Sequence, residues 1–276
     1  MALTAPYPEL GELLTLIGET GQRMSEIDAS EGAAGNISVY VGWPVDPRRL
    51  FPHVEQIELP EPLPELVGRS FLVTGSGRRL REITNDPPAN LGFVRVDDDG
   101  ARGTLFTSPR RLFARLTSEF NSHLAVHRDQ VQTTGTNFHA VVHAQPPHLT
   151  YLSHVPRYRD ETYFNAHLLR WQPETIVNLP EGIGVVPFVL PGSVDLMAET
   201  VKALRSHRVV LWSKHGVMAR SDQSVKRAGD RIEYAETGAR YEYMNLVDGE
   251  LAEGLTPSEL QQICEAFDVR PNCLNL

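Results

Sequence analysis

Several features are scarce in this 276-residue sequence, and each scarcity excludes a class of protein. The chain has only two cysteines, Cys264 and Cys273, which lie near the C-terminus and cannot cross-link the body of a fold. Disulfide-dense secreted domains are therefore excluded, and a reducing, cytoplasmic compartment is expected. No apolar run approaches the roughly 20 residues that a membrane-spanning helix needs. The N-terminal segment also lacks a basic stretch followed by an apolar one, so no signal peptide is expected.

Positive charge is also in short supply. The chain has 26 Lys and Arg residues against 35 Asp and Glu residues, which gives a formal net charge of -9. Proteins that bind nucleic acid or acidic membranes usually present a basic face, so neither partner is expected. A small phosphorylated ligand is not excluded, because it needs only a local group of donors. The hydrophobic content of 41% is ordinary for a globular protein and supplies enough side chains for a core.

The spacing of apolar residues predicts an alternation of helices and strands. Residues 42–70 contain six prolines and predict an irregular surface connection. Thr117 or Ser118 is expected to cap a helix that continues past Leu124. Further helices are predicted over 8–27, 161–171 and 222–246 and after the capping residues Ser193 and Thr256, and strands over 37–41, 71–74, 91–96, 183–188 and 208–212.

A histidine-rich stretch, residues 138–148, predicts a buried strand that stops at two prolines. Side chains alternate along a strand, so His139, Val141, His143 and Gln145 share one face. His143 and Gln145 are spaced roughly 6.6 Å along the backbone and suit two ligands converging on one metal ion. His139 lies roughly 13 Å from His143, too far to share that ion, and is expected to be a core or supporting residue. The alternative is that all these histidines are hydrogen-bonded core residues.

Other polar groups follow predicted strand ends or helix starts. A Gly-Asn loop at Gly35, a second glycine loop at residues 75–77 and the hydroxyls of Thr117 and Ser118 could hold an anion through backbone N–H groups. Each is also compatible with an ordinary turn or cap. Glu119 suits either a proton-transferring carboxylate or an acidic residue that stabilises a helix start. His215 follows a predicted strand and could supply a metal ligand from elsewhere in the fold.

A set of segments spread along the chain carries a further signal, namely residues 34–38, 71–77, 86–92, 117–119, 180–184 and 215–217. Taken in order, these segments resemble the zinc-dependent class II aldolase and adducin family. The resemblance covers nearly the whole chain, and several segments in the right order are more specific than any one alone. This family includes aldolases of rhamnulose and fuculose phosphates, a ribulose-phosphate epimerase and the adducin head domain.

The resemblance implies a single domain over residues 1–276 with a three-layer αβα fold, whose central mixed, largely antiparallel sheet is flanked by helices. It implies a metal-dependent aldolase that cleaves a ketose 1-phosphate, such as rhamnulose 1-phosphate, to dihydroxyacetone phosphate and an aldehyde. A cyclic homotetramer is also implied. The residues implied are Glu119 and Glu174 as catalytic carboxylates, His143 and His215 as metal ligands, and Gly35, Asn36, Ser76, Gly77, Thr117 and Ser118 as the substrate and phosphate site.

Two positions depart from the family pattern. Gln145 stands where the family has a third metal-binding histidine, and Ala33 stands where the aldolase has an asparagine near the phosphate. An amide oxygen is a poorer zinc ligand than imidazole, so Gln145 could bind through oxygen, yield to water, or favour Mn²⁺ or Mg²⁺ over Zn²⁺. The alternatives to an aldolase are an epimerase or dehydratase of the same family, a catalytically impaired adducin-like binding protein, and a structural metal site.

Overall fold

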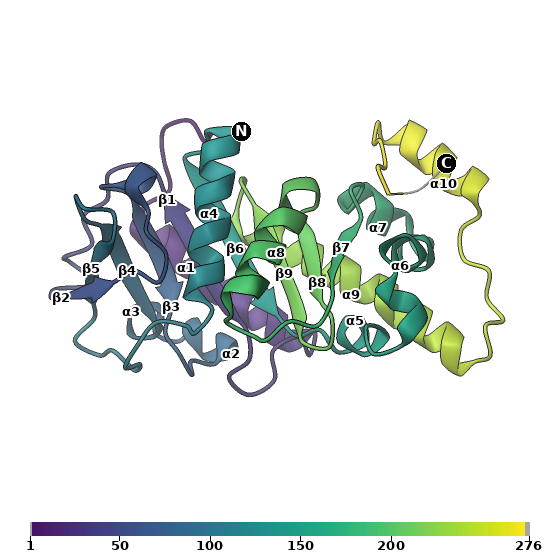
Figure 1. The fold of residues 1–276 in the computed structure, drawn as a ribbon, viewed down its shortest axis with the longest axis horizontal. Coiled ribbons are helices and arrows are strands. Elements are labelled where there is room, and N and C mark those ends of the chain that lie inside the picture. The colour runs from purple at the N-terminus through teal and green to yellow at the C-terminus, as the bar shows by residue number, and fades with distance from the viewer. Residues whose placement is uncertain (1, 274–276) are drawn as a thin grey trace.

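The structure is a computed structural model that describes residues 2–273, and its centre is a nine-stranded sheet (Figure 1). The strand order is β2-β5-β4-β3-β1-β6-β9-β8-β7, and only β7 and β8 pair in parallel. The predicted mixed, largely antiparallel sheet is therefore confirmed. The strands are β1 (Asn36–Val41), β2 (His53–Glu58), β3 (Ser70–Thr74), β4 (Leu91–Val96), β5 (Arg102–Thr107), β6 (Phe138–Ala144), β7 (Ile183–Val186), β8 (Val209–Trp212) and β9 (Gly216–Ser221).

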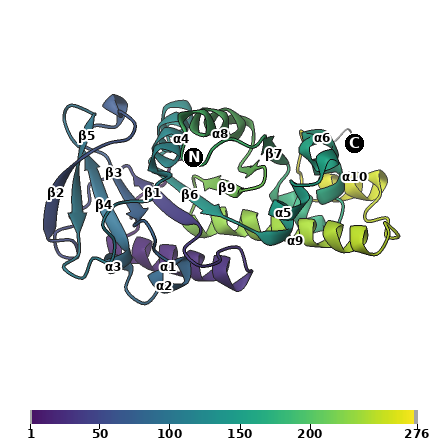
Figure 2. The same ribbon diagram turned by 60° about the horizontal axis from the view of Figure 1, so that its bottom comes forward.

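Helices cover both faces of the sheet, which confirms the predicted three layers. In Figure 2, α4 (Phe120–Thr134) and α8 (Val194–Ser206) lie over one face, and α1 (Leu10–Glu26) and α9 (Val225–Val247) lie under the other. The remaining helices are shorter and lie at the ends and edges of these layers. They are α2 (Leu80–Ile83), α3 (Pro87–Asn90), α5 (Pro147–Leu152), α6 (Glu161–Leu168), α7 (Pro173–Asn178) and α10 (Pro257–Ala266), with 3-10 turns at Pro64–Leu66 and Pro156–Arg159.

The register of β1 against β6 sorts the central side chains between the two faces. Asn36 pairs with His143, and Tyr40 pairs with His139, so these four residues point toward α4. The residues that alternate with these side chains along each strand point the other way. They join a single buried apolar cluster with α1 and α9, whose members include Ile37, Val39, Ala140, Val142, Ile17 and Ile232. One face of the central strands is therefore polar and the other is apolar, although both are buried.

Three details of the sequence-based prediction were wrong. Residues 42–70 contain β2, an exposed edge strand whose charged residues give no apolar alternation. The turn at His215 leads directly into β9, which the sequence analysis did not predict. The N-cap of α4 is Glu119 rather than Thr117 or Ser118, because Glu119 is the residue before the helix and its dihedral angles are not helical. Its side chain makes no capping hydrogen bond. The caps at Ser193 and Thr256 are confirmed, each by a side chain that accepts a backbone N–H.

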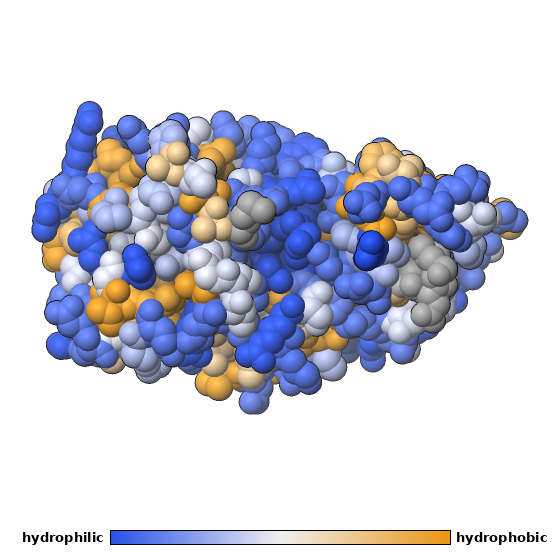
Figure 3. Space-filling view, turned by 90° about the horizontal axis from the view of Figure 1, so that it is seen from above, coloured by the Kyte–Doolittle hydropathy of each residue, from blue (hydrophilic) through white to orange (hydrophobic). Residues whose placement is uncertain are grey.

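The surface shows no continuous apolar band on the face drawn in Figure 3, where hydrophobic residues form separate patches in a mostly hydrophilic surface. Within residues 2–273, no helix combines the length and apolar character that crossing a membrane requires. Cys264 and Cys273 both belong to the described part of the chain, and neither forms a disulfide.

Candidate active site

Four strand ends meet at one edge of the sheet. β1 begins there at Asn36, which pairs with His143 near the end of β6. β9 begins there too, directly after His215, and pairs with β6. The end of β3 is joined to the segment before α4 by a bridge between Gly75 and Leu116. Antiparallel pairing therefore brings to one place several residues that are far apart in the sequence.

Glu119, His143 and His215 form a compact cluster at this edge, in which Glu119 and His143 are buried and His215 is partly buried. One carboxylate oxygen of Glu119 lies 3.5 Å from Nε2 of His143, and the other lies 3.5 Å from Nε2 of His215. One potential ligand atom from each residue can be chosen so that all three lie within 4.8 Å of one another. The two histidines and the carboxylate that were predicted to work together are thus adjacent.

The ring orientation of His143 is fixed on its far side. Its Nδ1 lies 2.8 Å from the carbonyl oxygen of Val217 and must donate a hydrogen bond to it, because a carbonyl oxygen only accepts. In the neutral ring this leaves a lone pair on Nε2. Trp212 packs against both histidine rings, with centroid distances of 4.8 Å to His143 and 5.1 Å to His215. A backbone acceptor that holds a histidine in this tautomer is the usual support for a metal ligand.

The electrostatics of the cluster favour an ionised carboxylate at Glu119 and a neutral ring at His215. Burial by itself raises the pKa of Glu119, but the charge of His143, a hydrogen bond from Asn36 and the charge of His215 together hold it below its ordinary value. Burial, and then the charge of His143, lowers the pKa of His215. The Nδ1 atom of His215 is buried, and no described residue forms a hydrogen bond with it.

These residues fit a divalent cation. The lone pair on Nε2 of His143 faces a buried carboxylate that a second imidazole also faces, and nitrogen with oxygen ligands is a donor set that zinc and related ions accept. Without a cation, the buried carboxylate of Glu119 would have, among residues 2–273, only the side chain of Asn36 as a hydrogen-bond donor of ordinary length. The site can therefore polarise an oxygen-rich substrate and move a proton beside it.

The family described as Class II Aldolase and Adducin N-terminal domain matches residues 15–243. The chain belongs to the class II aldolase and adducin family.

Relatives within this family are named as aldolases. A rhamnulose-1-phosphate aldolase from Klebsiella pneumoniae subsp. pneumoniae is 31% identical over 215 residues, 78% of this chain and 77% of the relative. Another from Bacteroides thetaiotaomicron is 29% identical over 264 residues, 95% of this chain and 96% of the relative. A crystal structure of a sugar-phosphate aldolase from Thermotoga maritima, 28% identical, covers 87% of this chain and 97% of its own, with a TM-score of 0.74. The class II aldolase-like fold is confirmed, and the chain is an enzyme of the aldolase class, a carbon–carbon lyase.

Gln145, where the family pattern has a histidine, lies beside the cluster. A methyl group added at Gly216 would come within 3.0 Å of Cγ of Gln145 and 3.2 Å of Cε1 of His143, so both side chains border the same glycine. That methyl would also lie 2.5 Å from the carbonyl oxygen of Ala144, which explains why only glycine fits. The side chain of Gln145 is thus near enough to take part, and its role as a ligand stays a prediction.

The predicted phosphate residues lie around the same edge of the sheet. Gly35 has a positive φ of 84°, and its α-carbon faces the carbonyl of His143, so no larger residue is accommodated. Gly77 also has a positive φ, 73°, with open space around it. Thr117 is buried and Ser118 is exposed, directly before Glu119. Their contact with a phosphate stays a prediction, as does that of Ser76.

Asn36 has its side chain engaged at both ends. Its amide nitrogen donates to Glu119 over 2.8 Å, and its amide oxygen contacts Nε2 of His123. The sequence analysis did not identify His123 or His127, which is also buried on α4. Two histidines four residues apart on one helix face were the signal that could have identified them. His139 is fully buried, in agreement with its predicted core or supporting role.

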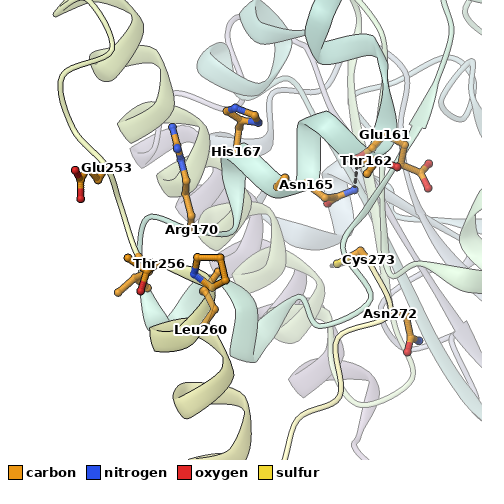
Figure 4. Close-up of a pocket in the computed structure, with 13 residues that line it drawn as sticks. Glu161, Thr162, Asn165, His167, Arg170, Glu253, Thr256, Leu260, Asn272 and Cys273 are labelled. Atoms are coloured by element: carbon orange, nitrogen blue, oxygen red, sulfur yellow. Dashed lines mark hydrogen bonds between the residues drawn. The ribbon is translucent and has the colours of Figure 1, made fainter. Parts of the chain in front are cut away.

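Glu174 is separate from the cluster within one chain. It is exposed on α7, which packs against α9 and α10 rather than against α4. A hollow of about 720 Å³ lies in this part of the molecule, and Figure 4 shows it to be lined by residues of α6, the start of α10 and the C-terminal stretch. None of its lining residues belongs to the cluster of Glu119, His143 and His215.

Proposed function

We propose that this enzyme is a metal-dependent aldolase that cleaves a ketose 1-phosphate resembling rhamnulose 1-phosphate. The products are dihydroxyacetone phosphate and an aldehyde. The observation that carries the proposal is the cluster of Glu119, His143 and His215, set beside two glycine loops and two hydroxyls. The names of the relatives from Klebsiella and Bacteroides support the choice of substrate.

His143 and His215 hold the divalent cation, with Gln145 as a third ligand through its amide oxygen. Zinc is the expected ion, and Mn²⁺ or Mg²⁺ is the alternative, because an amide oxygen is a harder ligand than imidazole. Such a cation supplies Lewis-acid polarisation of adjacent carbonyl and hydroxyl oxygens. The glycine loops at Gly35 and Gly77, with Asn36, Ser76, Thr117 and Ser118, orient the phosphate end of the substrate.

Glu119 transfers the proton that completes the cleavage. Glu119 is ionised in the resting cluster, and the negative charge that the substrate brings beside it raises its proton affinity, so it takes up a proton from the solvent as the substrate enters. When the C3–C4 bond breaks, the C4 hydroxyl loses its proton to give the aldehyde, and C3 gains the proton that Glu119 carries. Only 5% of Glu119 is exposed, so water is largely excluded from the carboxyl group. Glu174 takes the hydroxyl proton at the other end of the substrate. Because Glu174 is remote from the cluster of its own chain, it acts on the site of a neighbouring copy in a cyclic homotetramer. Each copy is a single domain over residues 1–276, and the enzyme works in the cytoplasm.

A product assay tests this function. The purified protein, loaded in turn with Zn²⁺, Mn²⁺ and Mg²⁺, is given a panel of ketose 1-phosphates, and release of dihydroxyacetone phosphate is measured. Release from at least one of these substrates, dependent on the added ion, is the expected result. Isomerised or dehydrated sugar phosphate without dihydroxyacetone phosphate would instead show an epimerase or dehydratase. Absence of both turnover and metal binding would favour an adducin-like binding protein.

A further inference from the structure

A chain of buried hydrogen bonds leads from Glu119 into the layer between the sheet and α4. Asn36 connects the carboxylate of Glu119 to Nε2 of His123, as described above. The other nitrogen of that ring, Nδ1, lies 2.6 Å from Oγ of Ser38. Ser38 is on β1 and points to the same face as Asn36, because the two residues are two positions apart on the strand.

The series of hydrogen bonds continues beyond Ser38 to two more histidines. Oγ of Ser38 lies 2.7 Å from Nε2 of His127, one helical turn after His123. Nδ1 of His127 lies 2.8 Å from Nδ1 of His139 on β6. Nε2 of His139 is buried and has no hydrogen-bond partner in the part of the chain that the structure describes. Ser38 and the three histidines each have 0% exposure, so water does not replace any link.

The carboxylate sets the direction of the first links. Asn36 presents its NH₂ group to the carboxyl group of Glu119 and its amide oxygen to Nε2 of His123. His123 must then carry its proton on Nε2 and accept on Nδ1. A hydroxyl can donate only one hydrogen bond, so Ser38 donates to Nδ1 of His123 and accepts a hydrogen bond from Nε2 of His127.

The remaining links follow in the same way. His127 donates from Nε2 and accepts on Nδ1, so His139 donates from Nδ1 and keeps a lone pair on its buried Nε2. The opposite direction would leave an N–H group at that atom, and an unpaired buried N–H is rarer than an unpaired acceptor. Burial, and then the positive charges of Arg220 and Arg231, hold the pKa of His139 well below its ordinary value. Those charges favour a lone pair at the end of the chain over an N–H.

We propose that Ser38, His123 and His127 are positioning residues, which fix the tautomer of each ring and the orientation of the Asn36 amide so that its NH₂ group is held against Glu119. The proposal deepens the aldolase function proposed above and rests on it for the role of Glu119. This series of hydrogen bonds prevents the side-chain amide of Asn36 from flipping and presenting its oxygen to the carboxyl group of Glu119. A carboxyl group held in one position, once it has taken up a proton, transfers that proton to C3 efficiently. A small misplacement of a reacting group can reduce the rate by up to about a hundredfold.

A pair of serine variants tests this role in the full-length, metal-loaded enzyme. Ser38→Ala interrupts the series of hydrogen bonds at its middle. Ser122→Ala makes the same change at a fully buried serine whose hydroxyl has no hydrogen-bond partner among the described residues. We expect Ser38→Ala to lower kcat by about 10- to 100-fold with KM changed by less than about threefold. Ser122→Ala should leave both constants within about twofold. Equal kcat values for the two variants would overturn the proposal.

A second pair tests whether hydrogen bonding, rather than shape, is what His127 supplies. The amide of a glutamine can donate at one atom and accept at another, whereas leucine can do neither. His127→Gln should therefore retain more of the wild-type kcat than His127→Leu, when both are compared at equal folded fraction. A His127→Gln variant no more active than His127→Leu would contradict the proposal.

The tautomers provide a readout that does not depend on activity or on the stability of any variant. In the zinc-loaded wild-type protein labelled with ¹⁵N-histidine, we expect protons on Nε2 of His123 and His127 and on Nδ1 of His139. A proton on Nδ1 of His123 or His127 would overturn the inferred direction. Failure of the aldolase assay with this tautomer pattern intact would reject the proposed function, whereas turnover with the opposite pattern would reject only the positioning chain.

Discussion

Strands β1 and β6 have two buried faces of opposite character. Toward α1 and α9 they present apolar residues such as Val39 and Ala140, which belong to one continuous hydrophobic cluster. Toward α4 they present Ser38 and His139, which are equally buried but hydrogen-bonded to each other through His127. The same strands therefore provide a core on one side and a polar layer on the other.

The difference shows what each face demands from its neighbours. An apolar face is stabilised by burial in proportion to area, so its residues can be exchanged at a graded cost. A buried polar layer is stable only when its donors and acceptors are paired, so its members must match in type and direction. The polar layer ends at Glu119, the carboxyl group that we propose transfers the proton. We expect changes to the apolar face to lower stability and changes to the polar face to lower activity.

The largest effect is expected at the catalytic end of the polar face. Glu119→Gln keeps the size of the side chain but removes the proton-transferring group, and kcat should fall by about 10³-fold or more. The unfolding midpoint should change little. The measurement is release of dihydroxyacetone phosphate beside thermal unfolding. The control is Glu242→Gln, at a buried carboxylate far along α9 that contacts Tyr158, Arg170 and Trp171. A near-wild-type kcat in Glu119→Gln would refute the assignment of Glu119 as the proton-transferring residue.

The apolar face should respond in the opposite way. Leu72→Ala on β3 removes a fully buried side chain opposite Val39 and should lower the free energy of unfolding by about 3 kcal/mol. The kcat per folded molecule should stay within about twofold. Urea unfolding and product release measure the two quantities, and Val54→Ala on the exposed strand β2 is the control. A large loss of kcat in folded Leu72→Ala would show that the two faces are not independent.

Acid should destabilise the polar face specifically. Burial, and then the charge of His127, lowers the pKa of His123 from 6.5 to about 3, so the unfolded chain binds a proton between these values and the folded chain does not. Stability is therefore greatest above about pH 6.5 and falls as the pH drops, by up to about 1.4 kcal/mol per pH unit for each such histidine. Urea unfolding between pH 8 and 5 measures this slope.

A variant separates this slope from other acid effects. Burial, and then the charge of His139, holds the pKa of His127 well below its ordinary value, so His127→Gln should make the pH dependence shallower by about one proton. His53→Gln, at an exposed position on β2, should leave the dependence unchanged. An identical slope in His127→Gln and the wild type would show that the buried histidines are not its source.

A smaller effect is expected from restoring the family residue at position 145. Gln145→His places an imidazole beside Gly216 and His143, where the side chain of Gln145 now lies. Zinc affinity should rise by about tenfold or more, because imidazole binds zinc better than a neutral amide. Competition with a chelator measures the affinity. Unchanged affinity would mean that position 145 does not reach the ion.

Much of the fold followed from local patterns. The apolar repeat of α1, the capping residues Ser193 and Thr256 and the alternation along β6 predicted elements that the structure contains. The edge strand β2 was missed because its side chains face solvent and leave no apolar period. The resemblance to the family identified Glu119, His143 and His215 together, which spacing alone did not require.

The sequence by itself determined most of the helices and strands, the family, and the residues that could provide metal ligands and a carboxylate, because residue types and spacing are local information. Only the tertiary structure decided which side chains share the buried layer beneath α4 and in which direction their hydrogen bonds run. The register of β1 against β6 and the position of α4 bring Asn36, Ser38, His123, His127 and His139 into contact. Pairing between residues so distant in sequence is set by the packing of the whole sheet, so no local pattern records it.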